Sequence, residues 1–197
     1  MYFPVDGSLA SEAVLPRLRG RFGRPYEHVE STPSTQLLLP ADAPEGALVV
    51  AEEQTAGRGR LGRHWLAPAG TSLLCSLQLR PSIAAEHLPE LTGVPSRACA
   101  EAIAAVTGLA PELKFPNDVL VGGRKVAGIL AEARDERVVL GIGLNVNVPA
   151  LELPREVERP ATSLLVETGV EVDRAELLVE LLEGLERRYD DWVSAAR

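Results

Sequence analysis

The chain has 197 residues, of which 46% are hydrophobic, and a formal net charge of −8 at pH 7. A chain of this length can form one hydrophobic core. No apolar run approaches the ~18 residues of a membrane-spanning helix. The excess of acidic residues argues against bulk nucleic-acid binding. Cys75 and Cys99 are too few for a disulfide framework or a metal cluster, and the N-terminus has no secretory-signal pattern. We expect a cytoplasmic protein with buried, reduced thiols and no nucleic-acid or membrane partner.

The first half of the chain is predicted to place short strands between turns and helices. A short helix over 8–18 is interrupted by Pro16, and the polar turn 31–36 also supplies helix caps. Strands are predicted at 26–30, 48–53 and 72–80, and helical segments at 86–91 and 96–106. The small residues of the last helix imply close packing against a sheet.

The second half is predicted to contain four short strands and two helices. The strands cover 113–115, 119–121, 125–132 and 137–146, with a hairpin turn at Gly122 and Gly123. Thr162 is expected to cap a short helix over 163–167, and Asp173 an amphipathic helix that ends near Ser194. The pattern predicts the α+β class, with a central mixed or largely antiparallel β-sheet flanked by helices.

A loop at 57–65 combines three glycines with three arginines, namely Gly57, Gly59, Gly62, Arg58, Arg60 and Arg63. Glycine lets a backbone approach a ligand, and arginine offers planar charged donors to phosphates and carboxylates. The loop therefore indicates a site for a small anion. Its spacing matches the dinucleotide fingerprint, but a strand follows where that fingerprint needs a helix. A solvated hairpin without a binding role is the other alternative.

Three later segments carry polar groups that a hydrophobic core does not require. Lys114 and the pair Asn117-Asp118 flank a tight turn, Lys125 begins an apolar strand, and Asn145 ends another. Each has a structural alternative: a plain turn for Asn117 and Asp118, a solvent-reaching strand-end lysine for Lys125, and a strand-end cap for Asn145.

Together with the Gly/Arg loop, these segments resemble the catalytic domain of biotin protein ligases, a class II synthetase-like biotin/lipoate ligase fold. The resemblance rests on residues 53–65, 124–132 and 141–147, and on 114–118, where the family usually has Trp at the second place. The four segments have the family's order and spacing, and the resemblance covers roughly residues 26–193.

The resemblance implies a ligase that makes biotinyl-5′-adenylate and pyrophosphate from biotin and MgATP. Biotin then passes to a lysine of the biotin carboxyl carrier protein of acetyl-CoA carboxylase. The implied catalytic residues are Lys125, Arg58 and Arg60. Those implied to contact biotin are Ser34, Thr35, Gln36, Gln54, Gly57, Arg58, Gly59, Arg60, Lys125 and Gly128. Those implied for the nucleotide are Arg58, Arg60, Arg63, Trp65, Lys114, Asn117, Lys125 and Asn145, with Asp118 at the Mg²⁺ ion.

Two of these assignments leave alternatives open. Ser34-Thr35-Gln36 stands for the family's Ser-Thr-Asn biotin motif, with Ser31-Thr32-Pro33 as its competitor, and either could serve as a helix cap. Trp65 either covers the ligand, stacks on adenine, or packs in the core.

The same resemblance divides the chain into an N-terminal extension, 1–25, and a catalytic domain, 26–197. We expect neither a DNA-binding helix-turn-helix nor the small SH3-like C-terminal domain of relatives. A homodimer through the central sheet is the family's habit. Two other functions stay open: a lipoate or octanoate transfer enzyme of this fold, and a non-catalytic biotin or nucleotide binding module.

Overall fold

A computed structural model of the chain describes residues 7–83, 85–154 and 160–196. Within these ranges a seven-stranded sheet has the order β1-β2-β3-β7-β6-β5-β4. The strands are β1 (Tyr26–Thr32), β2 (Leu48–Gln54), β3 (Ser72–Leu79), β4 (Glu112–Lys114), β5 (Asp118–Val121), β6 (Arg124–Arg134) and β7 (Arg137–Asn145). β1 pairs with β2 in parallel, and the other neighbouring pairs are antiparallel, so the predicted mixed sheet is confirmed.

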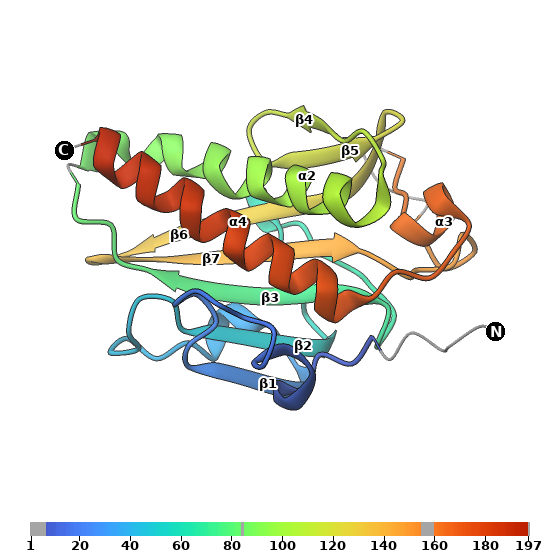
Figure 1. The fold of residues 1–197 in the computed structure, drawn as a ribbon, viewed down its shortest axis with the longest axis horizontal. Coiled ribbons are helices and arrows are strands. Elements are labelled where there is room, and N and C mark those ends of the chain that lie inside the picture. Colours follow the sequence, from blue (N-terminus) through green and yellow to red (C-terminus); the bar gives the residue numbers. More distant parts are fainter. Residues whose placement is uncertain (1–6, 84, 155–159, 197) are drawn as a thin grey trace.

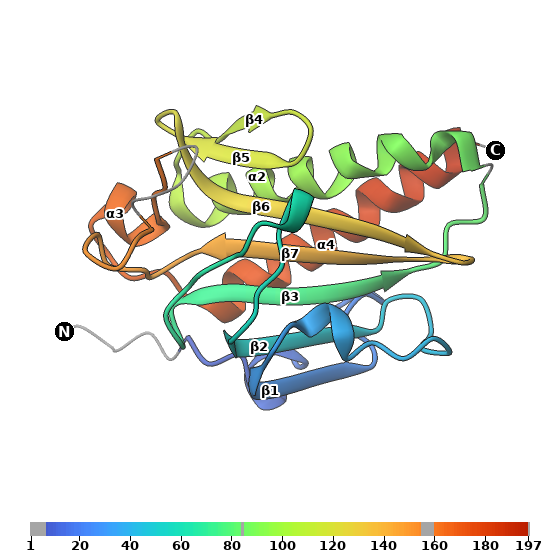
Figure 2. The same cartoon turned by 180° about the vertical axis from the view of Figure 1, so that it is seen from behind.

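The helices differ in length and lie on different parts of the sheet. The α-helices are α1 (Ser11–Val14), α2 (Gly93–Thr107), α3 (Leu164–Thr168) and α4 (Arg174–Ala195), and the 3-10 helices are η1 (Thr35–Leu37), η2 (Arg60–Gly62) and η3 (Ala85–Thr92). α2 and α4 run side by side over one face of the sheet (Figure 1). On the opposite face, the segment between β2 and β3 crosses β3, β7 and β6 (Figure 2).

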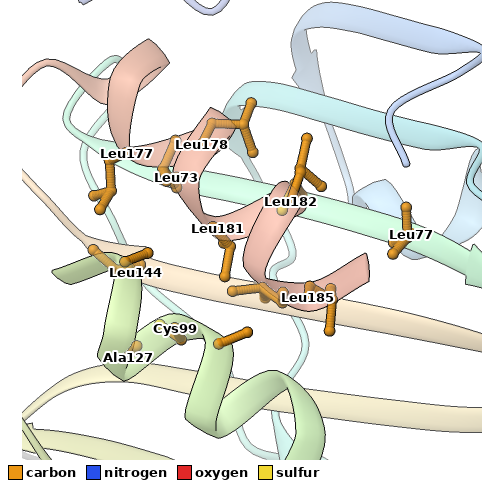
Figure 3. Close-up of a cluster of buried hydrophobic side chains, with 14 of the residues drawn as sticks. Leu73, Leu77, Cys99, Ala127, Leu144, Leu177, Leu178, Leu181, Leu182 and Leu185 are labelled. Atoms are coloured by element: carbon orange, nitrogen blue, oxygen red, sulfur yellow. The ribbon is translucent and has the colours of Figure 1, made fainter. Parts of the chain in front are cut away.

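The core lies between the sheet and the helix pair α2–α4. The apolar face of α4 is buried as its spacing predicts, with Leu177, Leu178, Leu181, Leu182, Leu185 and Tyr189 at 2% exposure or less. These leucines pack toward Leu73 and Leu77 of β3 and Leu144 of β7, beside Cys99 of α2 (Figure 3). Both cysteines are free and buried, as expected.

The segment before β1 joins this core. Leu9, Val14, Leu18 and Phe22 are buried in the same cluster as the α4 leucines. The arginines between them are held at the surface of α4: Arg17 pairs with Asp173 at 3.1 Å, and Arg21 pairs with Asp190 at 2.6 Å and Glu186 at 2.9 Å. These arginines therefore have acidic partners within the chain.

The predicted elements differ from the observed ones mainly at their ends. The strand predicted at 26–30 extends to Thr32, and the helical segment at 86–91 is a 3-10 helix. The prediction that Thr162 caps the short helix is wrong, because Ser163 accepts the hydrogen bond from Val166 N. Thr162 instead contacts the start of β6: its backbone N donates to Lys125 O at 2.8 Å. In the described part of the chain, no helix is long and apolar enough to cross a membrane.

Candidate active site

A cavity of about 650 Å³ is lined by residues of β3, β6 and β7 and of the segment between β2 and β3. That segment lies on the sheet face opposite α2 and α4 (Figure 2). The floor of the cavity includes residues of β3, β6 and β7, and its walls are η1, the Gly/Arg loop and the β4–β5 turn. The long segment between β2 and β3 forms one wall because it crosses from the outer part of the sheet to β6 before it returns (Figure 2). Segments that are far apart in the sequence therefore meet at one place.

The cavity collects nearly all of the residues singled out from the sequence. Its lining includes Ser34, Thr35, Gln36, Gln54, Arg58, Gly59, Arg60, Arg63, Trp65, Lys114, Asn117, Asp118, Lys125, Gly128 and Asn145. Gly57 is the predicted residue outside the lining. It supports the loop instead: Trp65 N donates to Gly57 O at 2.9 Å, and a Cβ at position 57 would lie 2.4 Å from Trp65 O.

Basic side chains outnumber acidic ones in the described lining of the cavity, although the protein is acidic overall. Arg58, Arg60, Arg63, Lys114 and Lys125 line it, and Asp118 is the acidic residue among its described lining. Lys125 Nζ lies 2.7 Å from Asp118 Oδ1, and Arg60 Nη1 donates to Asn117 Oδ1 at 3.0 Å. The turn at 116–118 is therefore more than a plain turn, because it orients two of the cations.

A short relay of polar groups lies at the η1 end of the cavity. Gln54 Oε1 accepts from Thr35 N at 2.9 Å and from Thr35 Oγ1 at 3.1 Å. Because the Thr35 hydroxyl proton is used in this way, the 2.7 Å contact between Thr35 Oγ1 and Ser76 Oγ requires Ser76 to donate. The relay fixes the orientation of the Gln54 amide and leaves its Nε2 as a donor at the cavity wall.

Gln36 offers the complementary group in the same region. Gln36 is 3% exposed, and its Nε2 donates to Leu130 O at 3.0 Å. Its Oε1 is buried and has no hydrogen-bond partner among the residues that the structure describes. A buried acceptor without a partner is costly, so this oxygen is suited to an N–H donor from a ligand.

The geometry also separates the two candidate polar motifs. Ser34, Thr35 and Gln36 line the cavity, whereas Ser31 and Thr32 belong to β1 and do not. Ser31 is exposed and donates to Glu53 Oε2 at 2.8 Å. Ser34-Thr35-Gln36 is therefore the segment that the fold brings to the candidate site.

Trp65 lies against the sheet over two glycines. A Cβ at Gly143 would be 2.6 Å from the Trp65 ring, and a Cβ at Gly128 would be 3.0 Å from it. Lys125 Nζ lies 5.7 Å from the centre of a Trp65 ring, and the buried Trp65 Nε1 has no hydrogen-bond partner within the described ranges. The glycines of β6 and β7 thus make room for the indole, which forms part of the cavity wall.

Two further lining residues are explained by packing. Asn145 is 4% exposed, and its Nδ2 donates to Thr162 O at 3.0 Å, so it holds the chain that follows β7. Burial raises the pKa of the Cys75 thiol to about 12, so this lining residue stays a protonated, unreactive thiol at neutral pH.

Sequence reasoning missed Ser76 and Glu132 as site residues. Ser72, Ser76 and Gln78 lie on one face of β3, where every second residue except Leu74 is polar, and all three are fully buried. This alternation was the available signal that one face of the strand meets polar groups. Glu132 of β6 contacts Arg58 of the Gly/Arg loop. The two residues are 74 positions apart in the chain, so no local pattern indicates their contact.

The fold and the site together are those of the biotin/lipoate protein ligase family. Residues 28–148 match the model of the biotin/lipoate A/B protein ligase family, and the chain belongs to that family. It is 41% identical over 158 residues to the bifunctional ligase/repressor BirA of Bacillus spizizenii, covering 78% of this chain and 49% of that protein. It is 40% identical over 182 residues to the biotin--[acetyl-CoA-carboxylase] ligase of Mycobacterium tuberculosis, covering 87% of this chain and 66% of that protein.

Solved structures agree with these relatives. The biotin protein ligase from Aquifex aeolicus in complex with biotin and ATP matches with a TM-score of 0.78 and 34% identity, over 87% of this chain and 73% of that chain. The Leishmania major biotin protein ligase in complex with biotinyl-5-AMP matches with a TM-score of 0.71 and 26% identity, over 84% and 75%. The present chain spans about half the length of the BirA proteins that it matches.

Proposed function

We propose that this chain carries the catalytic domain of a biotin--[acetyl-CoA-carboxylase] ligase. In the first step a carboxylate oxygen of biotin attacks the α-phosphorus of ATP, and pyrophosphate leaves. In the second step the amine of a carrier lysine attacks the acyl carbon of biotinyl-5′-adenylate, and AMP leaves. The carrier is the biotin carboxyl carrier protein of acetyl-CoA carboxylase.

One observation carries the proposal: a single cavity unites the four separated segments on which the family resemblance rests. Its η1 end holds neutral polar groups, with the Gln54 amide fixed by Thr35 and the Gln36 oxygen without a partner. Its other walls hold five basic side chains. The ureido ring of biotin is a neutral polar group and suits the η1 end, whereas the biotin carboxylate and the α-phosphate of ATP are anions and suit the basic walls. Relatives named as biotin ligases support this assignment.

The basic side chains address the main barrier to the first step. A carboxylate and an α-phosphate repel each other, and fixed cations in a cavity stabilise the charge that develops between them. Lys125 and Arg60 are each held in place by the β4–β5 turn before a ligand arrives. Lys125 lies beside both Asp118 and Trp65 and is itself part of the lining.

Mg²⁺ enters this scheme as part of MgATP. No group of three or more His, Cys, Asp or Glu side chains in the described ranges could hold a metal ion alone. Mg²⁺ commonly takes one or two carboxylates and otherwise phosphate oxygens and water. Asp118 is the carboxylate in the described lining, and we assign it as the protein ligand, with Lys125 its present partner. The ion would neutralise phosphate charge.

The test measures pyrophosphate release from MgATP with and without biotin, and the mass of a purified biotin carrier domain in parallel. Biotin-dependent release together with a biotin-sized mass gain supports the proposal. Release without a mass gain supports adenylate formation alone. No release with biotin, together with release with lipoate or octanoate, overturns the proposal in favour of the related acyl transfer. Binding of biotin or ATP without any release favours a non-catalytic module.

A further inference from the structure

Glu132 connects β6 to the Gly/Arg loop. Arg58 Nη2 lies 2.8 Å from Glu132 Oε1, and Arg58 Nη1 donates to Glu132 Oε2 at 3.2 Å. This two-point geometry fixes the direction of the guanidinium as well as its position. The pair closes a second cavity of about 440 Å³, which the loop residues 58–64 line together with Leu130 and Glu132.

The same carboxylate reaches the η1 end of the active site through one more residue. Arg134 Nη2 lies 2.6 Å from Glu132 Oε2, and Arg134 Nη1 donates to the backbone oxygen of Gln36 at 3.2 Å. A continuous path of polar contacts therefore runs from Arg58 through Glu132 and Arg134 to Gln36. It joins the anion-binding wall of the cavity to its neutral polar wall.

We infer that Glu132 and Arg134 are positioning residues that couple the biotin end of the site to its nucleotide end. The inference rests on the proposed function and adds that each ligand raises the affinity of the site for the other. The Arg58, Glu132 and Arg134 side chains are 43%, 24% and 27% exposed, so water can loosen these contacts when no ligand holds them.

The coupling arises because the two ligands would immobilise the same set of connected side chains. A ligand that immobilises Gln36 also immobilises the carbonyl to which Arg134 donates, and through Glu132 it fixes Arg58. A second ligand that contacts Arg58 then loses less conformational entropy on binding. By thermodynamic reciprocity, a phosphate group held by Arg58 raises the affinity for biotin by the same factor.

Amide hydrogen exchange in the ligand-free protein tests the link itself. Glu132→Gln removes the charge that both arginines share, and Glu136→Gln makes the same change in the exposed turn after β6. We expect Glu132→Gln to speed exchange at least about threefold in both 34–37 and 57–65, and Glu136→Gln to change neither. Acceleration of the loop alone, or of neither segment, overturns the inference.

Calorimetric titration of biotin with and without a non-hydrolysable ATP analogue tests the coupling. We expect the analogue to tighten biotin binding at least about fivefold in the wild type, and less than about twofold in Glu132→Gln and Arg134→Gln. A purely structural role would weaken both affinities but leave their ratio unchanged, and such a result overturns the inference. A wild-type ratio of one overturns it too. If the wild type binds neither ligand, the proposed function fails, and the exchange experiment alone decides the link.

Discussion

Lys125 is positioned by its surroundings before any ligand arrives, since Asp118 holds its Nζ at 2.7 Å. We expect Lys125→Ala to lower biotin-dependent pyrophosphate release about 100- to 1000-fold, the usual effect of removing one preorganised charge-stabilising group. Arg124→Ala is the matched control, because Arg124 is adjacent, pairs with Glu167 at 2.8 Å and is not part of the lining. Release within tenfold of the wild type in Lys125→Ala, with an unchanged melting temperature, would remove Lys125 from the mechanism.

Ser76 acts through Thr35. The Thr35 hydroxyl donates its hydrogen bond to Gln54 Oε1, so its oxygen can accept a hydrogen bond from Ser76. Ser76→Ala removes that donor and loosens the orientation of the Gln54 amide. Since one hydrogen bond is worth about 1 kcal/mol, we expect biotin binding, measured by calorimetry, to weaken about fivefold.

Ser72→Ala provides the control for this change. Ser72 is as deeply buried on the same strand, but its hydroxyl has no hydrogen-bond partner in the described structure. We expect its replacement to leave biotin affinity unchanged. Equal effects of the two substitutions would mean that the relay does not position Gln54.

At the scale of elements, Gly128 of β6 and Gly143 of β7 make room for the Trp65 indole, because a side chain at either position would come too close to the ring. Gly143→Ala puts a methyl group 2.6 Å from the ring position, so Trp65 must move away from the sheet. We expect pyrophosphate release to fall more than about tenfold, because a displacement of ~1 Å can cost about 100-fold in rate. A shift in tryptophan fluorescence of the free protein reports the displacement.

Gly184→Ala serves as the comparison for this substitution. Gly184 lies in α4, and the nearest neighbour of an added Cβ would be 3.8 Å away. Alanine in a helix interior is preferred over glycine by roughly 0.5–1 kcal/mol, so we expect a small gain in stability and unchanged activity. If Gly143→Ala behaved like Gly184→Ala, the close approach of Trp65 would have no functional consequence.

At the scale of the whole molecule, Glu52 joins the sheet to the start of α4. Its Oε2 lies 2.6 Å from Arg174 Nη1 and its Oε1 3.1 Å from His28 Nε2. Burial by itself would raise the pKa of Glu52, but the hydrogen bond and charge of Arg174, with a smaller contribution from His28, hold that pKa below its ordinary value of 4.5.

This lowered pKa predicts a specific acid sensitivity. The unfolded chain binds a proton at Glu52 at higher pH than the folded chain does, so the stabilisation is complete above about pH 4.5 and is lost as pH falls below it. We expect Glu52→Gln to flatten the fall of the urea-unfolding free energy between about pH 5 and pH 3. Glu112→Gln, on an exposed residue of β4, should leave that fall unchanged, and identical profiles for both variants would contradict the prediction.

A homodimer through the central sheet stays a prediction, as do the division at residue 25 and the expectation about further domains. Within the described structure, Leu9, Val14, Leu18 and Phe22 share one buried cluster with α4. Residues 7–25 are therefore packed as part of the same core.

Much of the fold could be predicted because its signals are local. The strand predicted at 72–80 and the amphipathic helix after Asp173 follow from the periods of strands and helices, and both are confirmed, although the strand ends at Leu79 and is buried on both faces. Asp173 caps α4 as predicted, accepting from Ala175 N and Glu176 N. The cap of α3 lies one residue later than predicted, because the Thr162 hydroxyl donates to Glu167 Oε1 and the Ser163 hydroxyl accepts from Val166 N.

The amino-acid sequence alone determined the fold class, the family and most residues of the candidate site, because strand and helix periods and four short motifs are properties of neighbouring residues. The tertiary structure decided what those residues contact. It brought Ser34-Thr35-Gln36 rather than Ser31-Thr32-Pro33 to the cavity, set Trp65 against Gly143, and joined Arg58 to Gln36 through Glu132 and Arg134. Such contacts form because the mixed sheet places strands that are distant in the sequence side by side, and local sequence patterns do not specify which strands become neighbours.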